Sequence, residues 1–178
     1  DRDAESHATG GLTPPARQEV VGTGNSWHER LARFRDREMF RVDMRHILGH
    51  VTEFGQFSAE LTDVAEAVID AGCRLCEAEL QAEFGSPALA DGSPCPLAVC
   101  ALGKLGGQEL GFASDIELMF VYEGDGSTTG PRQISNAEYF ARLVEQLLRV
   151  LSSPREGIFE IDLRLRPYGR AGSLGVSR

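Results

Sequence analysis

Two acidic residues stand at the start of an apolar run in the stretch GKLGGQELGFASDIELMFVYEGDG, residues 103–126. Asp115 and Glu117 are two positions apart, so both would project from the same face of an extended strand. Two negative charges at the edge of a buried strand cost free energy unless a positive group lies between them. The pair therefore predicts a site in which two carboxylates share a cation.

A third carboxylate comes from the stretch IFEIDLRLRP, residues 158–167, whose alternation of apolar and polar residues predicts a half-buried strand. If this strand lies beside residues 116–122, Asp162 meets Asp115 and Glu117. We expect Glu160 to pair with an arginine rather than to bind a metal. The apolar face would hold Phe159, Ile161, Leu163 and Leu165, and the polar face Glu160, Asp162, Arg164 and Arg166.

Converging carboxylates repel one another, and a divalent cation bound between them is the usual resolution. Carboxylate oxygens favour Mg²⁺ or Mn²⁺ over zinc, so Asp115, Glu117 and Asp162 are the candidate catalytic metal ligands. Arginines and the backbone amides of a glycine turn suit the oxygens of a polyphosphate beside the metal. The candidate nucleotide- and phosphate-binding residues are Gly103, Lys104, Gly106, Gly107, Ser114, Arg164 and Arg166.

The second half of the chain contains the elements that must position these residues. Short apolar runs predict strands at 96–103 and 116–122, and the alternating stretch at 158–167 predicts a third. Residues 123–133 have the composition of a loop. Ser135 is a candidate N-cap of the helix after it, with Glu138 at the capping-box position.

The first half has helical periodicity instead. One amphipathic helix runs from Trp27 to near Gly49, and a second covers about 58–84 before Gly85-Ser86-Pro87 stops it. Residues 86–95 are rich in proline, glycine and serine and predict a linker. The chain therefore divides into a flexible tail or linker at 1–26, a helical segment at 27–92 and a core at 93–178.

The composition of the chain argues against two classes of protein, those that bind nucleic acid through a basic surface and those that span a membrane. The chain has 178 residues and a formal net charge of −9, which argues against a broad basic surface for nucleic acid. No apolar run approaches the ~20 residues of a membrane helix, so we expect no membrane partner. The four cysteines are most simply free thiols in a cytoplasmic protein; a zinc site is the less favoured alternative. The absence of an initiator Met suggests a fragment or a processed chain.

The motifs match no common phosphate loop, because neither a Walker A sequence nor G-x-G-x-x-G occurs. A glycine turn followed by an acidic pair and a later acidic strand resembles the polymerase-beta-like nucleotidyltransferases. The longer stretches LGKLGGQELGFASDIELMFVY and EIDLRLRPYGRAGSL resemble the glutamine synthetase adenylyltransferase family, also called glutamate–ammonia-ligase adenylyltransferase. The helical stretch WHERLARFRDREMFRVDMRHILG resembles the helix before its catalytic domain, so the resemblance covers about residues 27–178.

This resemblance implies an α+β fold, with a helical segment before a nucleotidyltransferase mixed sheet flanked by helices. It implies Mg²⁺ or Mn²⁺ bound by Asp115, Glu117 and Asp162, although this chain has Glu117 where the family more often has Asp. It also implies glutamine synthetase, ATP, ADP and phosphate as partners, and a PII-type signalling protein that acts through other domains. The complete family enzyme carries two catalytic domains, so this chain would be one partial domain.

The direction of the reaction is implied by the same resemblance. In the family, the first domain removes AMP from a tyrosine of glutamine synthetase by phosphorolysis, and the second adds it from ATP. The ending RLRPYG resembles the first domain more, which favours deadenylylation. The alternative is a catalytically silent nucleotidyltransferase-like module that binds a partner or a regulator, which Glu117 in place of Asp favours. Independently of this, Asp115 could be a strand cap and the arginines surface ion pairs.

Overall fold

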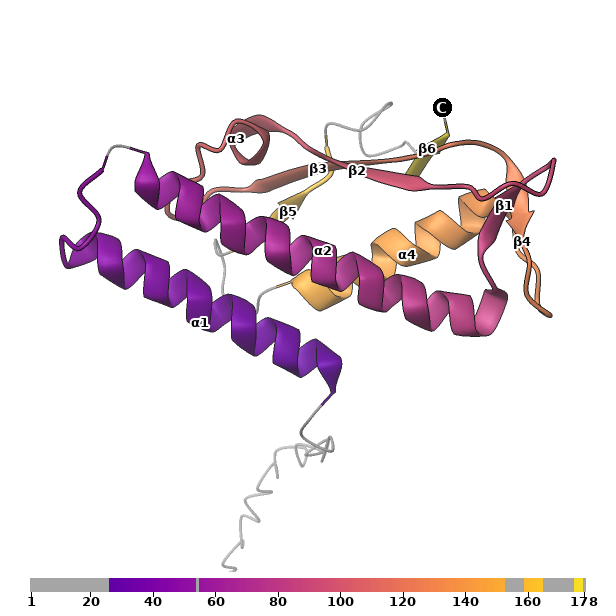
Figure 1. Ribbon diagram of the computed structural model, residues 1–178, viewed down its shortest axis with the longest axis horizontal. Coiled ribbons are helices and arrows are strands. Elements are labelled where there is room, and N and C mark those ends of the chain that lie inside the picture. The colour runs from indigo at the N-terminus through magenta and orange to yellow at the C-terminus, as the bar shows by residue number, and fades with distance from the viewer. Residues whose placement is uncertain (1–25, 54, 153–158, 165–174, 178) are drawn as a thin grey trace, which may run out of the picture.

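The chain forms an α+β structure in which a helical layer covers one face of a mixed sheet (Figure 1). The computed structural model describes residues 26–53, 55–152, 159–164 and 175–177. The predicted fold class is confirmed. The elements are α1 Trp27–Ile47, α2 Gln56–Phe84, β1 Pro87–Leu89, β2 Leu97–Ala101, α3 Gly103–Gly106, β3 Ile116–Tyr122, β4 Gly126–Thr128, α4 Asn136–Leu151, β5 Ile161–Asp162 and β6 Gly175–Ser177.

Both predicted N-terminal helices are present, and glycines mark their ends. Gly49, with φ 73°, lies just past the end of α1, and Gly85, with φ 76°, caps α2. Left-handed backbone of this kind favours glycine. A Cβ on Gly85 would also overlap the backbone of Gly130, so no larger residue fits this helix end.

β3 is the central strand of the four-stranded sheet. β2 pairs with it antiparallel, whereas β5 and β6 pair with it in parallel. Side chains alternate along β3, so that Ile116, Leu118, Phe120 and Tyr122 are buried while the residues between them are half-buried. The strands predicted at 96–103 and 116–122 are thus confirmed, and the half-buried face of β3 carries Glu117.

Two segments predicted to be irregular are strands. β1 lies within the predicted linker 86–95 and pairs antiparallel with β4, which lies within the predicted loop 123–133. Glycine makes this pairing possible, because a Cβ on Gly126 would overlap the carbonyl oxygen of Ala88. The Nδ2 atom of Asn136 donates to that same oxygen at 3.0 Å. The linker prediction was therefore wrong for 87–89, and the loop prediction for 126–128, because a close strand approach needs the same small residues as a loop does.

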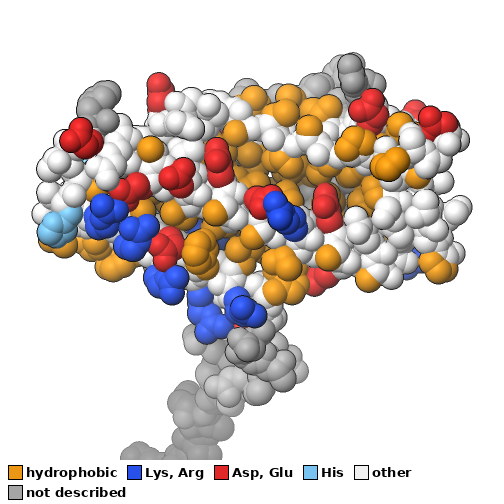
Figure 2. All heavy atoms as spheres, in the orientation of Figure 1, with side chains coloured by type: hydrophobic (Ala, Val, Ile, Leu, Met, Phe, Trp, Pro, Cys, Tyr) orange, Lys and Arg blue, Asp and Glu red, His pale blue; other side chains and the backbone are white. Residues whose placement is uncertain are grey.

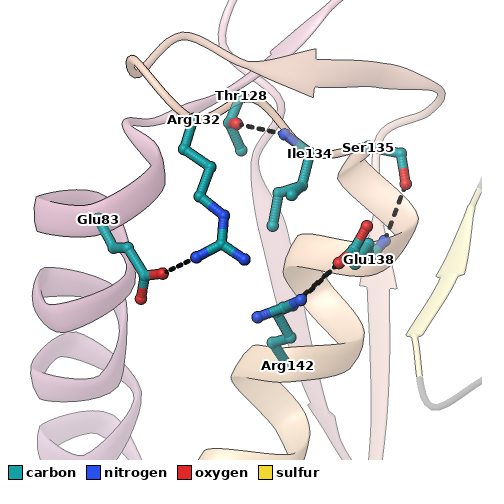
Figure 3. Close-up of polar contacts among 7 residues, drawn as sticks. All are labelled: Glu83, Thr128, Arg132, Ile134, Ser135, Glu138 and Arg142. Carbon is teal, nitrogen blue, oxygen red and sulfur yellow. Dashed lines mark hydrogen bonds and ion pairs between the residues drawn. The ribbon is translucent and has the colours of Figure 1, made fainter.

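Ser135 caps α4 as predicted, but Glu138 does not form the predicted capping box with it. The hydroxyl of Ser135 accepts a hydrogen bond from the backbone N–H of Glu138 at 3.1 Å (Figure 3). The carboxylate of Glu138 does not close a capping box; it accepts from Arg142 at 2.6 Å. Nearby, Arg132 donates to Glu83 at 2.6 Å and so connects the end of α2 with the segment before α4.

One hydrophobic core joins the two halves of the chain. Buried side chains from α1 and α2 pack in the same cluster as those from β3 and α4. Whether residue 92 separates two domains stays a prediction, but the helical segment and the sheet share this core. No helix in the described part of the chain is both long and apolar enough to cross a membrane. All four cysteines are free, as predicted, and Cys73, Cys76 and Cys95 are buried.

Candidate active site

Two of the three predicted carboxylates face each other across neighbouring strands. In the parallel pairing of β3 with β5, Glu117 stands opposite Asp162 and Ile116 stands opposite Ile161. Residues in register on adjacent strands project to the same face of a sheet. Since Ile116 is buried toward the helices, Glu117 and Asp162 lie on the face of the sheet turned away from them.

The strand predicted at 158–167 is much shorter than its sequence pattern suggests. Only Ile161 and Asp162 are strand residues in the described part of this stretch. Phe159 has a left-handed backbone with φ 57°, and it is buried. After the strand, a carboxylate oxygen of Asp162 accepts from the backbone N–H of Arg164 at 2.8 Å, which turns the chain. The alternation in burial holds on either side of the strand, where Phe159 and Leu163 are buried while Glu160 and Arg164 are exposed. Within the strand, Ile161 and Asp162 are both half-buried.

The positive group beside the carboxylates is the guanidinium of Arg164. Its Nε and Nη2 atoms donate to one oxygen of Asp162 at 2.7 and 2.6 Å. The hydrogen bond and the charge of Asp162 raise the pKa of Arg164, and the charges of Asp115 and Glu117 raise it further. Asp162 is therefore the predicted metal ligand that this cation contacts directly. Glu160 was expected to pair with an arginine. Arg164 pairs with Asp162 instead, because the turn directs it there, and a pairing of Glu160 with Arg166 stays a prediction.

The predicted glycine turn lies against the start of β3. It forms the one-turn helix α3, and the backbone N–H of Leu102 donates to the carbonyl of Glu117 at 2.9 Å. Gly103 has φ 51°, and a Cβ on it would overlap the carboxylate of Glu117. A Cβ on Gly106 would lie 2.5 Å from the carbonyl oxygen of Ala101. The two glycines thus allow the turn to approach both strands closely.

The other predicted binding residues have different surroundings. Lys104 and Gly107 are exposed on α3 and at its end. Ser114 holds the loop before β3, because its hydroxyl accepts from the backbone N–H of Gly111 at 3.0 Å. Arg166 lies outside the described residues. These four residues stay candidates for nucleotide or phosphate binding.

The donor set fits a hard divalent cation by its chemistry, since it consists of three carboxylates. Among the residues that the structure describes, no group of three or more His, Cys, Asp or Glu side chains is arranged as a metal site. In this arrangement the carboxylate of Asp162 is engaged by Arg164. Binding of Mg²⁺ or Mn²⁺ would require this guanidinium to move, and its 63% exposed side chain has room to do so.

Comparison with known proteins identifies the family. The family model described as glutamate-ammonia ligase adenylyltransferase matches residues 16–178. The chain belongs to the glutamate-ammonia ligase adenylyltransferase family. The resemblance inferred from the glycine turn and the two acidic strands is thereby confirmed.

Individual members of this family are similar over most of the chain. Three relatives carry the name bifunctional glutamine synthetase adenylyltransferase/adenylyl-removing enzyme. The protein of Thioalkalivibrio sulfidiphilus is 40% identical over 142 residues, which are 79% of this chain and 14% of the relative. That of Shewanella frigidimarina is 38% identical over 83% of this chain and 16% of the relative. That of Burkholderia mallei is 41% identical over 79% of this chain and 16% of the relative. The chain thus spans about a sixth of the length of these relatives.

Proposed function

We propose that this family member takes part in metal-dependent adenylyl transfer on a tyrosine of glutamine synthetase, and that phosphorolytic removal of AMP is its direction. Membership of the family and the names of its relatives support the reaction class. The observation that carries the proposal here is the pairing of β3 with β5, which puts Asp162 opposite Glu117, two residues after Asp115. Through this reaction the protein would regulate nitrogen assimilation in the cytoplasm.

In the removal reaction, an oxygen of inorganic phosphate attacks the phosphorus of the AMP–tyrosine ester. The new P–O bond gives ADP, the P–O bond to tyrosine breaks, and the tyrosine oxygen takes a proton. In the opposite family reaction, the tyrosine hydroxyl attacks the α-phosphate of ATP and pyrophosphate leaves. Both reactions require the attacking oxygen in line with the leaving oxygen and compensation of the phosphate charge.

The residues of this chain have distinct roles in that chemistry. Asp115, Glu117 and Asp162 would hold Mg²⁺ or Mn²⁺, which supplies charge neutralisation at the phosphorus centre. Arg164 exchanges its contact with Asp162 for a phosphate oxygen, since a guanidinium binds either anion through the same donors. Lys104 is exposed on the turn whose Gly103 lies against Glu117, and it can take a further phosphate oxygen. Regulation by a PII-type protein through other domains belongs to the same proposal.

The test uses the full-length protein with adenylylated glutamine synthetase, Mn²⁺ and inorganic phosphate, with ADP release as the measurement. We expect Asp115→Asn to reduce the rate at least a hundredfold. Asp125→Asn, an acid in the turn between β3 and β4, is the matched control and should keep the wild-type rate. The absence of ADP with the wild-type protein would contradict the deadenylylating assignment.

A binding measurement separates an enzyme from a silent module. Mn²⁺ together with ADP should raise the melting temperature of the wild-type protein, and Asp115→Asn should abolish the rise. A protein that releases no ADP and shows no such rise, yet still binds glutamine synthetase, would be the silent module considered from the sequence.

A further inference from the structure

A buried arginine on α1 lies far from the carboxylates in sequence but next to the strand that carries one of them. The side chain of Arg35 is 1% exposed, whereas those of Arg37 and Arg41 on the same helix are 72% and 48% exposed. Figure 2 shows basic side chains gathered at the surface along this helix. Arginine is almost never fully buried unless its charge is paired, so this burial requires specific partners.

The first partners are an acid on α1 and the end of α4. Arg35 donates from Nε to Asp36 at 2.9 Å and from Nη1 to the carbonyl of Leu151 at 2.6 Å. Leu151 is the last residue of α4, where helix carbonyls lack intrahelical partners and attract positive charge. Arg35 therefore fixes the C-terminal end of α4 against α1.

The second partner is the residue with the unusual backbone. The guanidinium carbon of Arg35 lies 5.8 Å from the ring centroid of Phe159, within the range of a cation–π contact. Phe159 is 2% exposed and has φ 57°. Arg35 thus contacts both flanks of the connection between α4 and β5: Leu151 before it and Phe159 after it.

The residues after Phe159 lead directly to the candidate site. The carbonyl of Glu160 accepts from the backbone N–H of Ile116 at 2.7 Å, and Asp162 then stands in register with Glu117. The β3–β5 pairing comprises two residue pairs in the described part of the chain. A slip by one residue would place Ile161 opposite Glu117 and turn Asp162 to the other face.

We propose that Arg35 is a positioning residue, which sets the register of β5 on β3 so that Asp162 meets Glu117 and Asp115. The described β3–β5 ladder has only two residue pairs, and Arg35 holds Phe159, three residues before Asp162, from outside that ladder. The consequence for catalysis rests on the proposed function; the consequence for the register does not.

The test compares three variants in the full-length protein. Arg35→Met keeps an unbranched, flexible side chain and removes the charge and the donors, and Arg35→Lys keeps the charge but loses the planar fork of guanidinium donors. Arg37→Met makes the same change at an exposed position of the same helix. Amide hydrogen exchange is followed by mass spectrometry in peptides that cover 159–164 and 97–101, below the melting temperature of every variant.

For Arg35→Met we expect exchange at least tenfold faster in 159–164, with less than a twofold change in 97–101. The kcat for ADP release should fall at least tenfold while KM for phosphate changes less than twofold. Arg35→Lys should recover part of both effects, and Arg37→Met should match the wild type.

Two outcomes would overturn the inference: equal acceleration of exchange in both peptides, or unchanged exchange in 159–164. The first would show that Arg35 only stabilises the fold as a whole. If the wild-type protein releases no ADP, the proposed function fails, and the exchange data still decide the role of Arg35. If Arg35→Met does not fold, the comparison of Arg35→Lys with the wild type decides in the same way.

Discussion

The carboxylate of Glu117 lies directly over Gly103, at the position where any other residue would carry its Cβ. The glycine turn and the acidic strand are thus in van der Waals contact, and the position of the carboxylate depends on the absence of a side chain. Gly103 also has φ 51°, a backbone conformation that L residues rarely adopt. Because a Cβ at position 103 would overlap the carboxylate of Glu117, only glycine fits before Lys104.

Gly103→Ala should therefore inactivate the site more than it destabilises the fold. The left-handed backbone alone costs an L residue roughly 1–2 kcal/mol, or a loss of about 2–8 °C in melting temperature. Displacement of Glu117 should lower ADP release at least tenfold. Gly111→Ala is the control, because a Cβ there meets nothing closer than the Ser114 hydroxyl at 3.7 Å. Equal activity of the two variants would show that Glu117 need not occupy this position.

Arg164→Met should affect cation and phosphate binding in opposite directions. The change removes the guanidinium that engages Asp162, so Mn²⁺ alone should bind several-fold more tightly by calorimetric titration. Binding of ADP with Mn²⁺ should weaken roughly tenfold, because a charge-assisted contact to phosphate is lost. Arg74→Met, at an exposed ion pair on α2, should alter neither affinity. Weaker Mn²⁺ binding in Arg164→Met would contradict a competition between this arginine and the metal.

The cysteines should differ sharply in reactivity. Burial raises the pKa of Cys73 and of Cys76 from 9.0 to about 12, so both remain protonated thiols at pH 8. The thiolate is the form that reacts with iodoacetamide, and Cys100 is the half-buried cysteine of the four. Mass spectrometry of the native protein should find Cys100 alkylated first, and all four cysteines alkylated in guanidinium chloride. Early modification of Cys73 would mean that α2 opens readily.

Stability should fall in alkaline solution. Burial is the main cause that raises the pKa of Tyr139 from 10.0 to about 12. Burial also raises the thiol pKa values of Cys73 and Cys76. The unfolded chain therefore loses these protons at lower pH than the folded chain, so stability is full below about pH 9 and declines toward pH 12. Urea unfolding at pH 8, 10 and 11 measures the decline. Tyr139→Phe should make it shallower, and an equal slope in this variant would exclude Tyr139 as a contributor.

Loss of the Ser135 cap on α4 should lower the free energy of unfolding by a predictable amount. Ser135→Ala removes the hydroxyl that accepts from the backbone N–H of Glu138, which is worth about 1 kcal/mol in comparable helices. Thermal unfolding should show a loss of roughly 2–4 °C for a chain of this size. Ser135→Asp should unfold at the wild-type temperature, since aspartate caps as well as serine does. A similar loss in both variants would point to packing rather than capping.

The sequence predicts the helices and β3 well because local patterns determine them. Apolar residues at helical spacing, together with Gly49 and Gly85, define the ends of α1 and α2. The buried run at 116–122 coincides with β3. The neighbouring strand β5 was predicted too long. The left-handed backbone of Phe159 and the turn made by Asp162 end the strand, and an alternating sequence pattern does not predict either of them.

The candidate site, too, could be predicted from the sequence only in part. The acidic pattern predicts that Asp115, Glu117 and Asp162 approach one another, and β3 and β5 are indeed neighbours. The contact between Gly103 and Glu117 could not be predicted, because it depends on how the turn folds over the strand. Arg35 has one signal in the sequence: it falls four residues after Leu31 and seven before Val42, on the buried face of α1.

The hydrogen bond from Arg35 to Leu151 also bears on the order of events during protein synthesis. The two residues are 116 positions apart. At about 5–20 residues per second on the ribosome, α1 emerges on the order of 10 s before its partner carbonyl exists. During that interval the arginine stays hydrated, and the apolar faces of α1 and α2 have no sheet or α4 to pack against. The acidic residues come together only when the end of α4 and Phe159 have been made, so a truncated translation product exposes its helices and never assembles the site.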